Sequence, residues 1–84
     1  MENEDPRVQF GKHLAKLRRS KGWSQEKLAL ESGLARSYLG GVERGQRNIA
    51  LVNICRLAHA LDMQPAVLMK FADQISNSEN GDRR

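Results

Sequence analysis

The stretch "LRRSKGWSQEKLALESGLARSYLGGVERGQRN", residues 17–48, contains two short helical patterns separated by a glycine turn. Ser24 is a good N-cap for the first pattern, and Gly33 ends it after about residue 32. The second pattern begins only a few residues later and covers about residues 35–43, ending before a further glycine. Two short helices joined by a tight turn are typical of a helix-turn-helix motif.

The sequence on both sides of this motif also shows apolar residues at helical spacing. Asp5 and Pro6 suit the N-cap and the first position of a helix, and Pro65 suits the start of the last one. No two-residue alternation of useful length predicts a strand. We therefore expect an all-α protein with helices over about residues 6–21, 24–32, 35–43, 50–61 and 65–74.

The length of 84 residues supports one domain, which we place at residues 6–75. Residues 1–5 are expected to be flexible, and the polar residues 76–84 to form a disordered tail. Cys55 is the single cysteine, so an internal disulfide is impossible and a reducing, cytoplasmic location is expected. The acidic N-terminus does not resemble a signal peptide, and no apolar run approaches the roughly 20 residues of a membrane span.

The positive charge is concentrated in the predicted domain. Residues 6–75 hold 12 Lys and Arg against 5 Asp and Glu, a net charge of +7. A domain this basic indicates a polyanionic partner, either nucleic acid or an anionic membrane surface. The alternative that these charges form only a solvated surface stays open. Binding to a membrane surface would need a helix with a free apolar face, but the apolar stripe of the first predicted helix is committed to the core.

The order of landmark residues closely resembles the Cro/repressor-like (Xre-type) helix-turn-helix family. The landmarks are Arg18, Gly22, Ser24-Gln25, Leu28-Ala29, Gly33-Leu34, Tyr38-Leu39 and Val42-Glu43-Arg44-Gly45. Within that family, "SYLGGVERGQRN" followed by "ALVNICRLAHAL" looks most like the controller proteins of restriction–modification systems, although other phage regulators share much of it. The resemblance implies a five-helix, lambda-repressor-like domain. It also implies a transcription regulator that binds a (pseudo)palindromic operator in double-stranded DNA as a homodimer.

The resemblance places the third helix in the major groove, where side chains near its N-terminus reach base edges. It implies base contacts by Arg36, Ser37, Tyr38, Gly41 and Arg47. Arginine can donate two hydrogen bonds to guanine, which favours Arg36 as the main reader. The alternatives are that Arg36 touches only phosphate and that Tyr38 leans on the second helix.

The resemblance also implies contacts with the DNA backbone, which position the protein rather than read sequence. The residues are Arg18, Ser24, Gln25, Gly40, Arg44 and Asn48. In the family, the residues at the positions of Arg18 and Glu43 face each other, which implies a partly buried ion pair between the first and third helices. Ala35 stands where the family often has a capping side chain, so early backbone amides of the third helix lack a cap.

Gly40 and Gly41 lie inside the third predicted helix, where each glycine costs about 0.5–1 kcal/mol relative to alanine. We expect them on the exposed side that faces the DNA groove, where they let the helix backbone approach the DNA. The alternative is that one glycine permits close packing against a neighbouring helix.

Apolar residues crowd the last predicted helix more densely than one helix face can hide. By analogy with the family, we expect a homodimer through the fourth and fifth predicted helices, with an interface that includes Val67, Leu68, Met69 and Phe71. The alternative is that these residues only complete the core of a monomer.

We expect no enzymatic activity, cofactor, metal or small-molecule ligand. Cys55 and His59 lie four residues apart, but two ligands do not make a structural metal site, and neither a base nor an oxyanion site is evident for catalysis. Cys55 is instead expected to be a semi-buried core residue. An alternative function is an antitoxin-type interaction module, which binds a protein partner through the tail that begins near Ser76.

Overall fold

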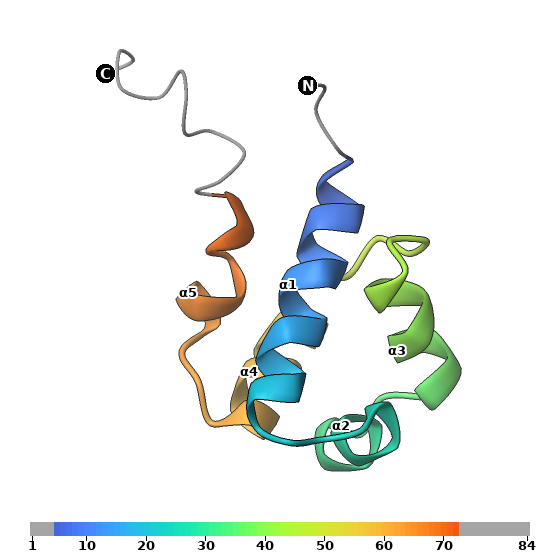
Figure 1. Cartoon of the computed structure of the whole chain (residues 1–84), viewed down its shortest axis with the longest axis vertical. Coiled ribbons are helices and arrows are strands. Elements are labelled where there is room, and N and C mark those ends of the chain that lie inside the picture. The colour runs from blue at the N-terminus through green and yellow to red at the C-terminus, as the bar shows by residue number, and fades with distance from the viewer. Residues whose placement is uncertain (1–4, 73–84) are drawn as a thin grey trace.

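The computed structural model describes residues 5–72, and the described part of the chain is all-α (Figure 1). Its elements are α1 (Pro6–Ser20), α2 (Gln25–Ser32), α3 (Arg36–Glu43), α4 (Leu51–Leu61) and α5 (Pro65–Leu68). The all-α expectation is thus confirmed over these residues. None of their helices is long and apolar enough to cross a membrane.

The helix starts follow local capping chemistry. The Asp5 carboxylate accepts a hydrogen bond from the backbone amide of Arg7, and Ser24 accepts one from the amide of Lys27. Gly33 adopts a left-handed conformation at the end of α2, whereas Ala35 starts α3 without a side-chain cap. Asp5 therefore belongs to the folded part, which corrects its assignment to the flexible N-terminus; residues 1–4 lie outside the described residues.

Helix α5 covers only the first part of the expected range of residues 65–74, because a turn follows it before residues 71–72 are helical again. Helix α5 ends at Leu68, and the amides of Met69 and Lys70 bond to carbonyls three residues back in a tight turn. Residues 73–84, which include the expected tail, lie outside the described residues.

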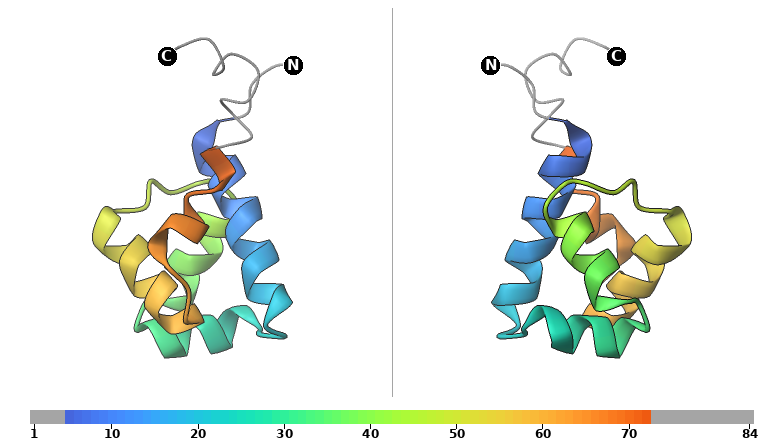
Figure 2. Two further views of the ribbon diagram at one scale, coloured as in Figure 1. Left: turned by 90° about the vertical axis from the view of Figure 1, so that its left-hand side faces the viewer. Right: turned by 90° about the vertical axis from the view of Figure 1, so that its right-hand side faces the viewer.

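The five helices surround a common centre (Figure 2). Each helix contributes at least one fully buried side chain to the core there. These side chains are Leu14, Leu28, Leu39, Val42, Leu57, Leu61 and Leu68. Burial of such apolar area is the main favourable term in folding. Helix α3 packs against both α1 and α2, so the core holds the helix-turn-helix as a rigid unit.

Two glycines allow α1 to lie against the end of α3. A Cβ atom on Gly11 would lie 2.5 Å from the carbonyl oxygens of both Val42 and Glu43. At Gly45, which has a φ of +77°, a Cβ atom would lie 2.6 Å from a methyl of Val8. The chain therefore turns directly after α3 at a position where only glycine fits.

Candidate nucleic-acid interface

The N-terminus of α3 is an exposed polar surface. Arg36 and Ser37 are both exposed there, and the preceding Ala35 leaves the first amides of α3 without a side-chain partner. The Nε of Arg36 lies 3.4 Å from a carboxylate oxygen of Glu26, and half of the Arg36 side chain is exposed. The backbone amide of Glu26 and then the charge of Arg36 lower the pKa of the Glu26 carboxyl. Such an exposed pair is weak, so Arg36 can turn to another anion.

The structure corrects the expected exposure of the two glycines in α3. Gly40 and Gly41 are both buried, and arginine side chains cover them. A Cβ atom on Gly40 would lie 3.1 Å from Nη1 of Arg44 and 3.2 Å from Nη1 of Arg36. A Cβ atom on Gly41 would lie 2.9 Å from Cγ of Arg47. The side chains of these arginines therefore pack directly on the backbone of the glycine pair.

Tyr38 links this surface to α4. Its ring is half-buried against the core, and its Oη accepts a hydrogen bond of 3.1 Å from Nδ2 of Asn53. The guanidinium of Arg47 lies over the same ring, 5.5 Å from the ring centroid. Tyr38 therefore supports Arg47 and contacts α4, whereas the partners expected from the sequence were the DNA and the second helix.

Arg18 and Glu43 form the ion pair that the family resemblance implies. Nε of Arg18 lies 2.8 Å from Oε2 of Glu43, and the side chains are 9% and 5% exposed. Two further guanidinium nitrogens donate to Oε1 of Glu43 and to the carbonyl of Trp23. The hydrogen bonds with Glu43 raise the pKa of Arg18. Because the guanidinium is buried in these bonds, the structure corrects the expectation that Arg18 contacts a phosphate.

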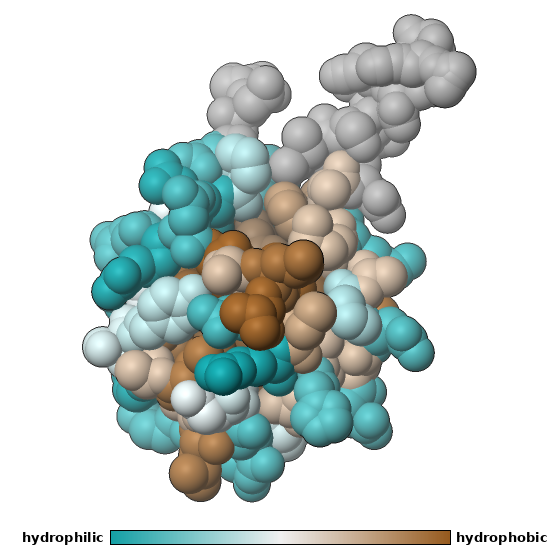
Figure 3. All heavy atoms as spheres, turned by 180° about the vertical axis from the view of Figure 1, so that it is seen from behind, coloured by the Kyte–Doolittle hydropathy of each residue, from teal (hydrophilic) through white to brown (hydrophobic). Residues whose placement is uncertain are grey.

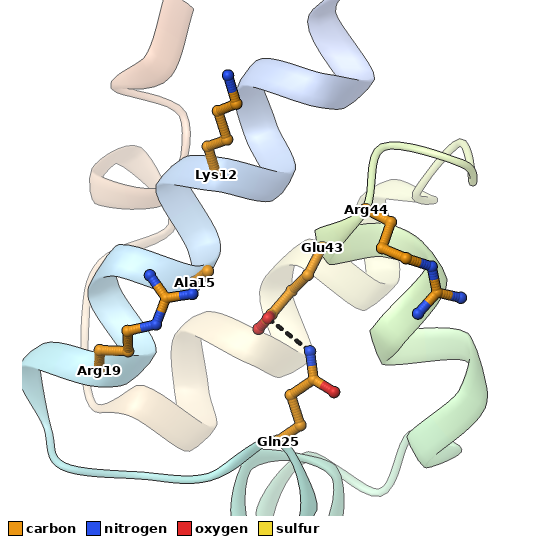
Figure 4. A pocket seen from close by; sticks show the side chains of 6 residues that line it. All are labelled: Lys12, Ala15, Arg19, Gln25, Glu43 and Arg44. Carbon is orange, nitrogen blue, oxygen red and sulfur yellow. Dashed lines mark hydrogen bonds between the residues drawn. The ribbon is translucent and has the colours of Figure 1, made fainter.

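Gln25 joins this ion pair from the first turn of α2. Its Nε2 donates a hydrogen bond of 2.8 Å to Oε1 of Glu43 (Figure 4). Burial raises the pKa of Glu43, but the hydrogen bonds from Arg18 and Gln25 outweigh burial, and the pKa lies below its ordinary value. Glu43 is therefore a carboxylate at neutral pH, and three helices meet at it.

A basic pocket of about 280 Å³ opens beside Gln25, between α1 and the end of α3 (Figure 4). Its lining residues are Lys12, Ala15, Arg19, Gln25, Glu43 and Arg44. Lys12 and Arg19 are not among the DNA contacts expected from the sequence. Their spacing of seven residues, which places both on one face of α1, was the available signal.

Three further residues are expected to contact the DNA backbone, and they come from the segments before α2 and after α3. Arg44 is exposed beside the basic pocket, and its Nε donates to the side-chain oxygen of Gln46. Asn48 is exposed in the segment that follows α3. The Ser24 hydroxyl already accepts a bond from the amide of Lys27, so its proton is what it can offer to a phosphate.

Seen from behind the view of Figure 1, hydrophobic side chains gather near the middle of the surface (Figure 3). We use the name apolar face for three large exposed side chains, those of Leu51 and Val52 on the first turn of α4 and of Met69 after α5, which are 75%, 61% and 42% exposed. Met69 also lines a shallow pocket of about 140 Å³, and the other lining residues are Pro6, Arg7, Phe10, Arg47, Asn48, Ile49, Ile54 and Phe71.

The four residues expected in a dimer interface differ in their exposure. Leu68 is fully buried, which corrects its assignment to the interface, because its side chain belongs to the core of one chain. Phe71 is half-buried and packs edge-on against Phe10, with ring centroids 5.6 Å apart. Val67 is half-buried, and its carbonyl lies 2.7 Å from Nε2 of His13. Met69 alone of the four is exposed.

Cys55 and His59 are both exposed on α4, which corrects the expectation that Cys55 is semi-buried. Among residues 5–72, no group of three or more His, Cys, Asp and Glu side chains is placed to hold a metal ion.

The sequence model of the helix-turn-helix family matches residues 14–68, from the middle of α1 to the end of α5. The chain belongs to the helix-turn-helix family. The resemblance stated from the sequence is thereby confirmed.

Similar proteins include several controllers. The control protein C.BamHI of Bacillus amyloliquefaciens is 45% identical over 74 residues, which cover 87% of this chain and 90% of that protein. The crystal structure of the restriction–modification controller C.AhdI from Aeromonas hydrophila has a TM-score of 0.74 and 62% identity over 75% of this chain and 96% of that chain. The controller C.Esp1396I, as a tetramer with its natural 35-base-pair operator, has a TM-score of 0.76 and 27% identity over 87% and 97% of the two chains.

Proposed function

We propose that this helix-turn-helix protein is a sequence-specific DNA-binding transcription regulator, of which two copies bind a (pseudo)palindromic operator. The observation that carries the proposal is the gathering of Arg36, Arg44 and Arg47 over the glycine pair of α3. A helix fits the major groove, and clustered arginines supply both phosphate attraction and base contacts.

In this proposal the bases are contacted by Arg36, Ser37 and Arg47. Arg36 and Ser37 stand at the exposed N-terminus of α3, from which helix-turn-helix proteins reach base edges. Arg47 extends the same surface from the segment that follows α3. Tyr38 and Gly41 lie beneath Arg47, so their contribution to base recognition is to support that arginine.

The positioning role goes to a band of residues around the basic pocket. Ser24, Gln25, Arg44 and Asn48 keep the backbone contacts implied by the resemblance, and Gly40 contributes by holding Arg44 above it. We add Lys12 and Arg19 of α1, because their side chains line the basic pocket beside Gln25 (Figure 4). Cations around a polar pocket match the charge of a backbone phosphate.

The dimer forms through the apolar face in this proposal. Leu51, Val52 and Met69 are large apolar side chains exposed to solvent, and exposed apolar patches mark interaction surfaces. A second copy lets two α3 helices read half-sites about one helical turn apart, which raises both affinity and specificity.

The relatives named as control proteins support the finer assignment as a restriction–modification controller. The controller crystallised with its operator supports the same kind of DNA partner for this chain. A cytoplasmic location follows from that partner. We assign no catalytic step, cofactor or metal to the chain. The antitoxin alternative depends on residues 76–84, which lie outside the described residues, and no observation favours it.

The test is equilibrium binding to the DNA that precedes the protein's own gene, measured at several salt concentrations. A shuffled duplex of the same composition is the control. We expect preferential binding to the native duplex. The magnitude of the slope of log affinity against log salt should fall by about 1, which corresponds to the loss of one phosphate contact, for Lys12→Ala and for Arg19→Ala. Lys16→Ala is the matched control, because Lys16 is exposed on α1 but does not line the basic pocket. Equal affinity for both duplexes would overturn the proposed function.

A further inference from the structure

We propose that Asn53 of α4 is a positioning residue for DNA recognition, which aligns Arg47 over α3 by anchoring the Tyr38 ring. This inference rests on the proposed function, because it concerns the precision with which Arg47 meets the DNA. Asn53 itself is half-buried on the first turn of α4.

Arg47 needs outside support because it lies between α3 and α4, in a segment without regular secondary structure. A long side chain in such a segment samples many rotamers, and it loses that freedom when it binds. Here the Arg47 stem runs across Gly41, close enough that a Cβ atom there would lie 2.9 Å from Cγ. The guanidinium lies over the Tyr38 ring at 5.5 Å. Two contacts therefore hold Arg47 against α3 before any DNA is present.

The Tyr38 ring needs support in turn, because a cation above a ring is aligned only as well as the ring is. Tyr38 is half-buried at its base, and the hydrogen bond of 3.1 Å from Asn53 holds the hydroxyl at its far end. The donor is well fixed, because α4 is packed into the core through Ile54 and Leu57. The alignment of Arg47 thus runs from α4 through Tyr38.

The first experiment compares affinity for the operator and for a shuffled duplex. Asn53→Ala should lower the ratio of the two affinities about two- to tenfold, the range expected for the loss of one hydrogen bond. Tyr38→Phe removes the acceptor of the same bond and should lower the ratio by a similar factor. His59→Ala, at an exposed position of the same helix, is the control and should leave the ratio unchanged.

A double variant that also lacks the Arg47 side chain distinguishes a loss of Arg47 alignment from a general structural effect of Asn53→Ala. Arg47→Ala alone should lower the ratio, and adding Asn53→Ala to it should lower the ratio no further. If Asn53→Ala leaves the ratio intact, or lowers it by the same factor with and without Arg47, the proposal is overturned.

A measurement without DNA tests the alignment directly. The ring current of Tyr38 should shift the side-chain proton resonances of Arg47 upfield in the wild-type protein, and Asn53→Ala should move them toward random-coil positions. Unchanged Arg47 resonances in a folded Asn53→Ala variant would overturn the inference. If the wild type binds operator and shuffled duplex equally, the proposed function fails, and these resonances still decide whether Asn53 aligns Arg47.

Discussion

The guanidinium of Arg18 meets the carboxylate of Glu43 through two hydrogen bonds of 2.8 and 2.9 Å, in a place that is almost closed to solvent. The pair joins α1 to the last residue of α3, and Gln25 adds a bond from α2. The orientation of the helix that carries Arg36 therefore depends on one buried carboxylate.

Glu43→Gln should destabilise the fold by about 3–5 kcal/mol, because it leaves the Arg18 charge buried without its partner. Urea unfolding measures the change in the free energy of unfolding. The double variant Arg18→Met/Glu43→Leu is the control, and it should recover most of the loss, because apolar residues of similar size replace both charges. A single variant as stable as the wild type would show that the pair contributes nothing.

Acid should unfold the protein partly through Glu43. The pKa of Glu43 lies below its ordinary value of 4.5, so the unfolded chain takes up a proton first as the pH falls. The stability due to this carboxylate is present above about pH 4.5 and is lost as the pH falls through the lower pKa of the folded state. Wild type should therefore lose more stability between pH 5 and pH 3 than Arg18→Met/Glu43→Leu, by urea unfolding at each pH. Equal losses of stability in the two proteins would show that other carboxyl groups cause the acid sensitivity.

Two glycine-to-alanine substitutions should change stability in opposite directions. Gly11→Ala should cost about 2–3 kcal/mol, because its methyl would meet two backbone carbonyls at 2.5 Å and push α1 away from α3. Gly40→Ala should gain up to about 1 kcal/mol of helix propensity, because its methyl meets only the movable ends of side chains, those of Arg36, Arg44 and Gln25. Thermal unfolding of the two variants beside the wild type checks the signs. A stabilised Gly11→Ala protein would contradict the close packing of the helices.

The oligomeric state should respond to the apolar face but not to exposed apolar residues elsewhere. Leu51→Lys places a charge on that face and should convert the dimer into monomer in sedimentation velocity at micromolar concentrations. Leu30→Lys is the matched control, because Leu30 on α2 is 77% exposed and Leu51 is 75% exposed. Dissociation by Leu30→Lys, or a dimeric Leu51→Lys protein, would move the interface away from the apolar face.

The helix boundaries were predictable wherever a local signal sets them. Asp5 with Pro6 starts α1, Ser24 starts α2, and Gly33 ends α2 at the expected places. The end of α5 was not predictable in this way, because no breaker follows Leu68 and the chain leaves the helix through a tight turn. Capping chemistry is local, so a sequence displays it directly.

The contacts that shape the candidate site join residues from different elements, and a single sequence does not display them. Gly11 meets the carbonyl of Glu43 across more than thirty residues, and nothing near Gly11 indicates that. The glycine pair of α3 is unusual in a helix, but its covering by Arg36, Arg44 and Arg47 depends on where long side chains lie. The support of Arg47 by Asn53 through Tyr38 likewise needs the packing of α3 beside α4.

The central claim, that α3 reads bases through Arg36, is tested most directly by selecting bound sequences from a random pool of double-stranded DNA. We expect the wild-type protein to enrich a palindrome whose half-sites lie about one helical turn apart. Arg36→Ala should enrich the same arrangement without the preference for guanine at one symmetric pair of positions. A wild-type pool without an enriched sequence, or an Arg36→Ala pool with the full wild-type preference, would contradict the claim.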